Sequence, residues 1–175
     1  GRILPVLEVK NLRTFYFTEK GVLKAVDGIN LSLEKGEVLG LAGESGCGKS
    51  TIMLSIINLV PSPGRIVGGE VLFDGKNLVK KSDKEMMKIR WKRISLVFQE
   101  AMGAFDPLYT IGDQILEAIN YHQKISKEES IKRVGNLLEM VGIDGTRGKD
   151  YPYEFSGGML QRALIAMALA CNPDV

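Results

Sequence analysis

Apolar and polar residues alternate through much of the first hundred positions and then change to a helical spacing. The alternation, interrupted by turn residues, predicts strands at residues 6–12, 15–17, 23–26, 29–33 and 69–76. Turns are predicted at Asp27-Gly28 and, as the strongest short signal, at Asp74-Gly75. The first part of the chain is therefore expected to form half-exposed antiparallel strands.

Two segments lack this alternation and are apolar for most of their length. Residues 36–42 read Gly-Glu-Val-Leu-Gly-Leu-Ala, and residues 94–98 read Ile-Ser-Leu-Val-Phe. Short apolar runs of this kind are typical of strands that a parallel sheet buries on both faces. We expect both segments in the core, the first as a buried strand and the second as a central strand.

Helical spacing and capping residues predict helices at residues 52–59, 82–91, 111–121, 126–142 and 159–171. Ser82 and Ser126 each stand three residues before a Glu, which is the pattern of a capping box. The helix that follows Ser126 carries one apolar face formed by Ile131, Val134, Leu137, Leu138 and Val141. The last predicted helix is apolar nearly all the way round and should be buried.

The composition describes an ordinary soluble protein of 175 residues with a net charge of +2. That charge is too small to indicate a nucleic-acid or membrane surface by itself. The longest apolar stretch, residues 163–171, has about half the length needed to span a bilayer. No signal peptide is expected, and the two cysteines have no metal or redox spacing, so a reducing cytoplasm is the default.

The most informative stretch lies between the first buried strand and the first predicted helix. It fits the pattern G-x-x-x-x-G-K-[ST] with the residues Gly43, Glu44, Ser45, Gly46, Cys47, Gly48, Lys49, Ser50 and Thr51. Its glycines let backbone amides approach phosphate oxygens, and the helix start adds further donors and the positive end of a dipole. Lys49 would reach the β- and γ-phosphates, and the Ser50 hydroxyl would bind Mg²⁺. The stretch predicts a nucleotide site.

A second turn of small residues, Ser156-Gly157-Gly158, also precedes a helix. Taken alone it is an ordinary N-cap followed by turn glycines. Together with residues 43–51 and Gln99, the run Phe155-Ser156-Gly157-Gly158-Met159-Leu160-Gln161-Arg162 resembles the signature of the ATP-binding subunits of ABC transporters. The resemblance covers essentially the whole chain and is nearest to the oligopeptide/dipeptide importer branch, which residues 106–115 and Tyr151-Pro152 also resemble.

The resemblance implies an α/β fold with a P-loop NTPase core, an antiparallel β subdomain and an inserted α-helical subdomain. Residues 1–99 would form the β subdomain with the P-loop core, residues 100–155 the helical subdomain, and residues 156–175 the signature and the helix after it. The implied function is that of an ATPase which powers an importer, bound as a peripheral protein to the cytoplasmic face of the cell membrane.

The resemblance also implies a role for individual residues. Tyr16 matches the aromatic residue that stacks on adenine, and Gln99 the residue that contacts Mg²⁺ and the attacking water. Ser156, Gly157 and Gly158 match the signature that binds the γ-phosphate of ATP held by a second ATP-binding subunit, arranged head-to-tail. Residues 100–121 match the region that docks the transmembrane permease subunits, and a solute-binding protein would act indirectly.

Some positions differ from the family pattern. Ala101 stands where a Pro is usual, Tyr153 where a His is usual and Phe155 where a Leu is usual. The strand that carries the family's Asp-Glu pair, which supplies the second Mg²⁺ contact and the general base, would begin directly after Pro173. The resemblance therefore implies a cassette that is incomplete at its C-terminus, and we expect the 175-residue chain to hydrolyse ATP poorly or not at all.

Three other classes are compatible with parts of the pattern. An ABC ATPase of repair or translation would carry duplicated cassettes or long coiled coils, which this sequence does not suggest. A P-loop GTPase or kinase leaves the signature around Ser156 unexplained, and no Asn-Lys-x-Asp motif is present. A non-enzymatic nucleotide-binding or interaction fragment is the third alternative. Neither the transported solute nor the choice between a homodimer and a heterodimer can be read from these residues.

Overall fold

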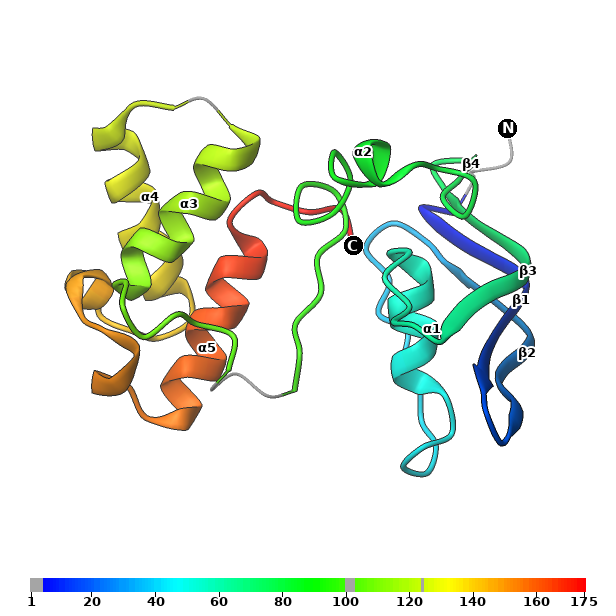
Figure 1. Ribbon diagram of the computed structural model, residues 1–175. Helices are drawn as coiled ribbons and strands as arrows, with labels where there is room; N and C mark the ends of the chain where they lie inside the picture. Colours follow the sequence, from blue (N-terminus) through cyan, green and yellow to red (C-terminus); the bar gives the residue numbers. More distant parts are fainter. Residues whose placement is uncertain (1–4, 100–102, 124) are drawn as a thin grey trace. The chain divides into compact units, whose positions relative to one another are not determined.

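Strand β1 (Leu7–Thr18) runs through the middle of a four-stranded antiparallel sheet in the computed structural model, which describes residues 5–99, 103–123 and 125–175. The sheet order is β2-β1-β3-β4, where β2 is Gly21–Leu33, β3 is Gly64–Phe73 and β4 is Lys76–Asn77 (Figure 1). Leu7 lies opposite Leu33 on one side and Phe73 on the other. The predicted antiparallel strands are confirmed, and so is the turn at Asp74-Gly75.

The loose alternation of the first strand has a structural cause. Leu7 and Val9 are buried, and then the buried positions move to Leu12 and Thr14. The register shifts between Lys10 and Arg13, and Asn11 has a positive φ of 47°. A bulge of this kind inserts one residue into a strand, so the side chains on the buried face change from odd-numbered to even-numbered positions.

The predicted turn at Asp27-Gly28 is wrong. Strand β2 continues from Gly21 to Leu33 through these residues, and Gly28 has a φ of 84° within it. The pairing with β1 shifts register between Leu12 and Arg13, where Asp27 lies opposite Arg13. The Asp-Gly pair therefore marks an irregularity in a long strand, because β1 supplies pairing partners on both sides of it.

Helix α1 (Lys49–Ile56) packs beside the sheet, and a buried hydrogen-bond chain connects the two. Ser55 Oγ donates its proton to Thr51 O at 2.6 Å, so Thr14 Oγ1 is the donor in its 2.8 Å contact with Ser55 Oγ. Both hydroxyl groups are therefore satisfied although the two residues are almost completely buried.

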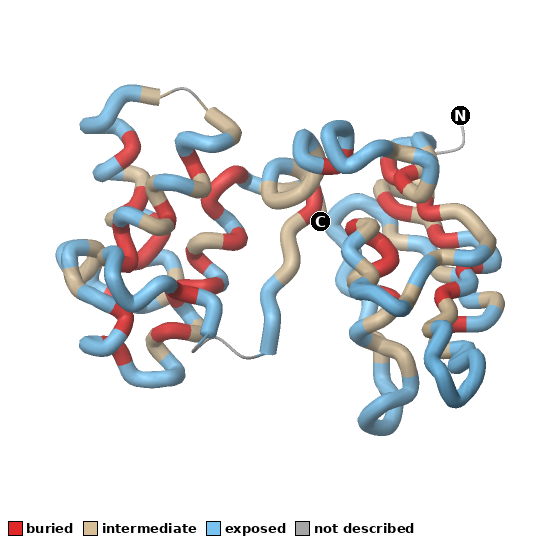
Figure 2. The backbone as a smooth tube through the Cα atoms, viewed as in Figure 1, coloured by how far each residue is buried: buried red, intermediate tan, exposed pale blue. Residues whose placement is uncertain are grey.

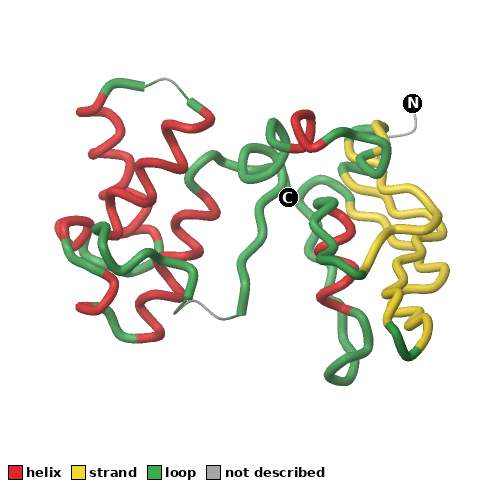
Figure 3. Tube along the Cα trace, in the orientation of Figure 1, coloured by secondary structure: helices red, strands yellow, loops and turns green. Residues whose placement is uncertain are grey.

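Neither of the two predicted parallel core strands forms a strand here. Residues 37–44 and 95–98 are without regular secondary structure (Figure 3), and Val38 is 95% exposed. A strand exists only through backbone pairing with a neighbour. Within the described residues, two backbone hydrogen bonds join the start of the second segment to the last residue: Ser95 N donates to Val175 O at 2.9 Å, and Val175 N donates to Arg93 O at 3.1 Å.

The chain divides into two compact units, residues 1–87 and residues 88–173, with Asp174 grouped with the first and Val175 with the second. Helix α2 (Asp83–Met86) closes the first unit, and its capping box is present as predicted, although the helix stops before Trp91. The second unit contains α3 (Ile111–His122), α4 (Lys127–Met140) and α5 (Gly157–Leu169), together with the short 3₁₀ helices η1 (Gly145–Lys149) and η2 (Pro152–Glu154).

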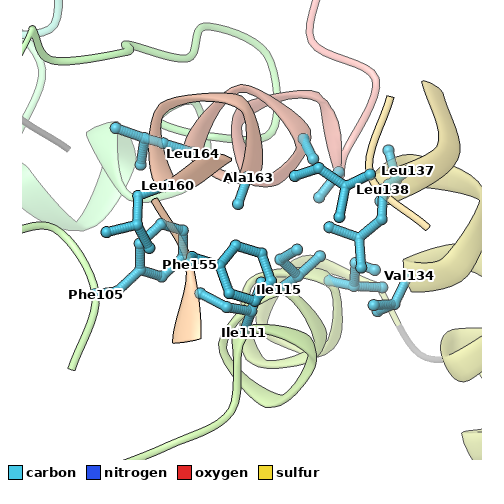
Figure 4. Close-up of a cluster of buried hydrophobic side chains, with 14 residues drawn as sticks. Phe105, Ile111, Ile115, Val134, Leu137, Leu138, Phe155, Leu160, Ala163 and Leu164 are labelled. Carbon is cyan, nitrogen blue, oxygen red and sulfur yellow. The ribbon is translucent and has the colours of Figure 1, made fainter. Parts of the chain in front are cut away.

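The core of the helical unit lies where α3, α4 and α5 face one another (Figures 2 and 4). Ile111, Ile115 and Ile119 recur every four residues along α3 and are fully buried. The predicted apolar face of α4 is confirmed for Val134, Leu137 and Leu138, whereas Ile131 is 54% exposed. Backbone packs against backbone next to this core, since a Cβ on Gly112 would lie 2.6 Å from Gly148 O.

Candidate nucleotide site

Helix α1 begins in a different way from the other α-helices of the described chain. Helices α2, α3, α4 and α5 start at Ser82, Thr110, Ser126 and Ser156, and each of these side chains accepts a hydrogen bond from a first-turn amide. Helix α1 starts at Gly48, with no side-chain cap and no acidic residue in its first turn. Its first amides therefore remain available as donors for an anion, and the helix dipole adds to the attraction.

Two glycines of the loop lie in close contact with other atoms. Gly48 has a φ of 96°, and a Cβ there would lie 2.3 Å from Ala25 O of strand β2. A Cβ on Gly43 would lie 2.6 Å from Cys47 Sγ. The loop consequently folds tightly on itself and against β2. Gly48 has no room for a Cβ, whereas at Gly43 the Cys47 side chain would have to rotate away.

The ammonium group of Lys49 points back over the loop. Its Nζ donates to Gly43 O and to Glu44 O, each at 2.7 Å, and lies 3.3 Å from Cys47 Sγ. A cation is therefore held above the backbone turn that the sequence predicts to bind phosphate. Glu44, Ser45, Gly46 and Cys47 are exposed at the tip of the loop, as is Ser50 in the first turn of α1, while Thr51 is half-buried.

Tyr16 lies in β1 and belongs to the same unit as the loop. It pairs with Leu23 on one side and Gly64 on the other, and Gly64 leaves space for its ring, since a Cβ there would lie 2.6 Å from Tyr16 Cε1. A cation lies over each of the neighbouring aromatic rings. The guanidinium carbon of Arg65 is 4.2 Å from the centre of the Phe17 ring, and Lys24 Nζ is 5.5 Å from the centre of the Phe15 ring. Tyr16 is half-buried.

Gln99 is exposed and belongs to the helical unit. The segment before it, residues 95–98, lies alongside helix α5 and forms hydrogen bonds with it. Ser95 Oγ donates to Ala168 O at 2.9 Å, and Gln161 Nε2 donates to Phe98 O at 3.3 Å. Gln161 and Ala168 are seven residues apart, two helical turns, and so lie on one face of α5. The helix that carries the predicted signature therefore also holds the residue next to Gln99.

The predicted signature turn starts helix α5. Ser156 Oγ accepts from Met159 N at 3.3 Å, and Leu160 N donates to Ser156 O at 2.9 Å. Gly157 and Gly158 are exposed, and a Cβ on either would meet nothing within 4 Å. The turn is thus an exposed helix N-terminus with a hydroxyl group and two residues without side chains.

The predicted site residues fall into two groups, one in each unit. Tyr16 and residues 43–51 belong to the first unit, and Gln99 and Ser156-Gly157-Gly158 belong to the second. Of residues 100–121, which are predicted to dock the permease, 100–102 lie outside the described residues. Reasoning from sequence gave no role to Arg147, which contacts the backbone just before the signature turn; no motif marks this residue, because its partners become neighbours only in the fold.

Other candidate features lie apart from these residues. A cavity of about 410 Å³ in the helical unit is lined by residues of α3, α4 and η1, among them Asp113, Thr146 and Lys149, and by none of the residues predicted to bind nucleotide. His122 is half-buried, and partial burial, with a smaller effect of Lys92, lowers the pKa of its imidazole.

Among the described residues, no three His, Cys, Asp or Glu side chains are grouped as a metal site. In the same residues, no helix has the length and apolar character needed to cross a membrane.

Comparison with known protein families adds an independent finding. The family described as ABC transporter matches residues 26–175. The oligopeptide transport ATP-binding protein OppD of Bacillus subtilis is 47% identical over 99% of the chain, and the dipeptide transport ATP-binding protein DppD of the same organism is 47% identical over 97%. These matches cover 49% and 52% of the two relatives, so the chain spans about half the length of the curated relatives it matches.

Solved structures give the same picture of the fold. A dimeric structure of MJ0796, a bacterial ABC transporter cassette, matches with a TM-score of 0.86 and 31% identity, and the match covers 95% of this chain and 70% of that one. The structure of cbiO1 from Clostridium perfringens, part of the ABC transporter complex cbiONQ, matches with a TM-score of 0.77 and 29% identity, over 97% of this chain and 62% of that one. The predicted α/β fold, with an antiparallel sheet and a helical part, is confirmed.

Proposed function

The chain belongs to the ABC transporter family, and from this premise we propose that it is the ATP-binding, energy-coupling part of an importer for oligopeptides or dipeptides. The observation that carries the proposal is the uncapped start of α1 behind a glycine loop, with Lys49 at the first helical position. Free amides, a helix dipole and an ammonium group together favour a polyphosphate. The choice of peptides as cargo rests on the similarity to peptide-transport proteins.

Residues 43–51 would hold the phosphates of ATP through their backbone amides. Lys49 would bind the β- and γ-phosphates, exchanging its contacts with Gly43 O and Glu44 O for phosphate oxygens. Tyr16 would stack on adenine, a role supported by its half-buried ring and by the cations that already lie over Phe15 and Phe17.

Ser50 and Gln99 would each supply an oxygen to a magnesium ion bound with the nucleotide. Ser50 exposes a hydroxyl oxygen and Gln99 an amide oxygen, and Mg²⁺ in nucleotide sites takes one or two protein oxygens beside phosphate and water. Ser50 and Gln99 would hold the ion, which would supply positive charge next to the transferred phosphate, and Gln99 would also orient the attacking water.

The turn at Ser156-Gly157-Gly158 would bind the γ-phosphate of ATP held by a second ATP-binding subunit. An exposed helix N-terminus with two glycines suits an anion, and MJ0796 is a related cassette with a dimeric structure. Two subunits placed head-to-tail would then enclose ATP between them. ATP binding closes such a dimer and hydrolysis opens it, which supplies the motion that drives a permease.

Hydrolysis and transport are proposed for the full-length protein, because the relatives are about twice as long as the matched region. The permease would dock on residues 100–121, where Leu108 is 79% exposed and Tyr109 is 58% exposed. Apolar side chains this accessible next to a helix start suit a protein interface. The protein would lie at the cytoplasmic face of the membrane as a peripheral subunit.

Replacing Lys49 tests the proposal. In the full-length protein we expect Lys49→Ala to reduce ATP hydrolysis by about 10²-fold or more, because the transferring phosphate loses its ammonium partner. Lys35→Ala removes an exposed lysine from the same unit and serves as the charge-matched control, with turnover expected to stay within about twofold. Both are measured as phosphate release with Mg-ATP.

Two further measurements complete the test. Competition between ATP and GTP for a fluorescent ATP analogue separates this proposal from a GTPase, and peptide uptake by cells that carry the Lys49→Ala protein separates a transport ATPase from one of another kind. Full turnover by Lys49→Ala would overturn the assignment of the loop. Unchanged peptide uptake, together with lost hydrolysis, would overturn the assignment to transport.

A further inference from the structure

Arg147, in the 3₁₀ helix η1, reaches the chain on both sides of the signature turn. Its Nε forms an ion pair with Asp150 Oδ2 at 2.7 Å, and its Nη2 donates to Glu154 O at 3.1 Å. The guanidinium carbon lies 4.8 Å from the centre of the Phe155 ring, and Nη1 lies 3.6 Å from Met159 Sδ. One side chain therefore contacts the two residues before Ser156 and a residue of the first turn of α5.

The contacts of Arg147 connect the turn to hydrogen-bonded and buried parts of the helical unit. Asp150 is held at its backbone, since Ile111 N donates to Asp150 O at 3.0 Å and Asp150 N donates to Arg147 O at 3.0 Å. Phe155 is 7% exposed and belongs to the core cluster that also contains Ile111 and Leu160 (Figure 4). A planar guanidinium can pair with a carboxylate and lie against a ring at the same time, which a lysine cannot do.

The turn itself has few constraints of its own. Gly157 and Gly158 have no side chains to pack, and both are exposed. Ser156 is held from its C-terminal side by the hydrogen bonds that start α5. From its N-terminal side it is held through Glu154 and Phe155, the residues that Arg147 contacts.

We infer that Arg147 is a positioning residue, which orients Ser156 and the amides of Gly157 and Gly158 toward the γ-phosphate carried by the partner subunit. This inference rests on the proposed function of the signature turn. Arg147 does not touch the phosphate; it holds the backbone of Glu154 and Phe155 and so sets the direction of the helix start. A donor displaced by about 1 Å loses much of its hydrogen bond to a fixed anion, so the ordering of this backbone governs binding in the dimer.

Arg133 provides a matched control within the same unit. Its guanidinium group also forms two hydrogen bonds, to Gln123 Oε1 at 2.8 Å and to Ala170 O at 2.5 Å. Neither partner belongs to the signature turn or to the residues next to it. Arg133→Ala therefore reports the effect of losing a structural arginine. Lys149→Ala removes a positive charge from η1 itself and controls for charge.

The test uses the full-length protein and measures subunit association as a function of Mg-ATP concentration by light scattering, beside binding of a fluorescent ATP analogue to the separate subunit. We expect Arg147→Ala to raise the ATP concentration needed for association by about tenfold, the factor that one charge-assisted hydrogen bond supports. Arg147→Lys keeps the charge, and the ATP concentration it needs for association should lie between those of Arg147→Ala and the unsubstituted protein. Nucleotide binding by the separate subunit, and association of Arg133→Ala and Lys149→Ala, should stay within about twofold of the unsubstituted protein.

Hydrogen exchange at the amides of residues 156–160 provides a second readout. Arg147→Ala should speed exchange there, and Arg133→Ala should not. The inference is overturned if Ser156→Ala weakens ATP-dependent association while Arg147→Ala does not, or if Arg133→Ala weakens it as much as Arg147→Ala does. In either case the proposed function stands. If the unsubstituted protein binds ATP but neither ATP nor Ser156→Ala affects association, the proposed role of the signature turn fails first.

Discussion

The two cysteines are expected to differ in thiol reactivity because the fold exposes one and buries the other. Cys47 is exposed at the tip of the glycine loop, where its Sγ lies 3.3 Å from Lys49 Nζ. Cys171 is buried, its thiol lies 3.7 Å from Ala118 O, and burial raises the pKa of that thiol. Because the thiolate is the reactive form, a raised pKa and a buried sulfur both slow reaction with electrophiles.

Thiol labelling should therefore separate the two residues. With a maleimide at pH 7 we expect Cys47 to react at least about tenfold faster than Cys171, which should react only when the helical unit opens. Cys47→Ser should remove the fast phase, and Cys171→Ser should retain it. If nucleotide binds over the loop, Mg-ATP should slow the fast phase. Equally fast labelling of Cys171 in the native protein would contradict its burial.

At the scale of single elements, the start of α1 shows why two glycines of one loop differ. Gly46 has a φ of 80°, and a Cβ there would meet nothing within 4 Å. Gly48 has a φ of 96°, and a Cβ there would lie 2.3 Å from a backbone oxygen of strand β2. The first position requires an unusual backbone conformation, while the second also requires space that no rotamer change can create.

We expect Gly46→Ala to lower the free energy of unfolding by about 1–2 kcal/mol, the cost of a left-handed conformation for a residue with a Cβ. Gly48→Ala should cost more, about 3 kcal/mol or above, because β2 or α1 must also move. Urea denaturation of the two variants, followed by circular dichroism, measures the difference. Equal losses would show that the backbone of β2 moves away at little cost.

Helix boundaries could be predicted from sequence more fully than the core strands. Ser82, Ser126 and Ser156 cap their helices as expected, because capping depends on residues three positions apart. Residues 36–42 and 94–98 were expected as strands from their apolar character, but pairing depends on backbone far along the chain, and the described residues supply almost none. The same limit applies to Asp27-Gly28, which the long partner strand β1 draws into β2.

In the candidate site, too, features set by residues close in sequence could be predicted, and features set by residues far apart in sequence could not. The loop at residues 43–51 and the turn at Ser156 are contiguous in sequence, so spacing alone identifies them. Arg147 and Gln161 act on residues that are brought near by folding, Arg147 on Glu154 and Phe155, and Gln161 on Phe98. The proposed direct contacts with nucleotide could thus be predicted, and the residues that hold them in place could not.

Considered as a whole, the molecule has two units with separate sets of buried residues. Leu12 is fully buried in the sheet, and Leu138 is fully buried in the helical cluster, whose members all come from residues 105–170. A cavity made in one set removes no contact within the other. Met140 lies two residues after Leu138 on α4 but is 69% exposed.

Truncation of either leucine to alanine should destabilise its own unit by about 2–5 kcal/mol, the usual cost of a cavity in a well-packed core. Hydrogen exchange should rise in residues 5–87 for Leu12→Ala and in residues 103–173 for Leu138→Ala. Met140→Ala is the control and should change stability by less than about 0.5 kcal/mol. A rise in exchange spread evenly over both units from either leucine variant would show that they unfold as one.

The two carbonyl oxygens that hold Lys49 have a consequence for the choice of ligand. Gly43 O and Glu44 O already give the ammonium group two short hydrogen bonds, so any incoming group competes with the loop's own backbone. A neutral acceptor offers no more than these carbonyls and gains nothing by replacing them, whereas a multiply charged phosphate gains the full attraction between opposite charges. We therefore expect the loop to bind polyanions in preference to neutral ligands, and more strongly the more negative charge the ligand carries.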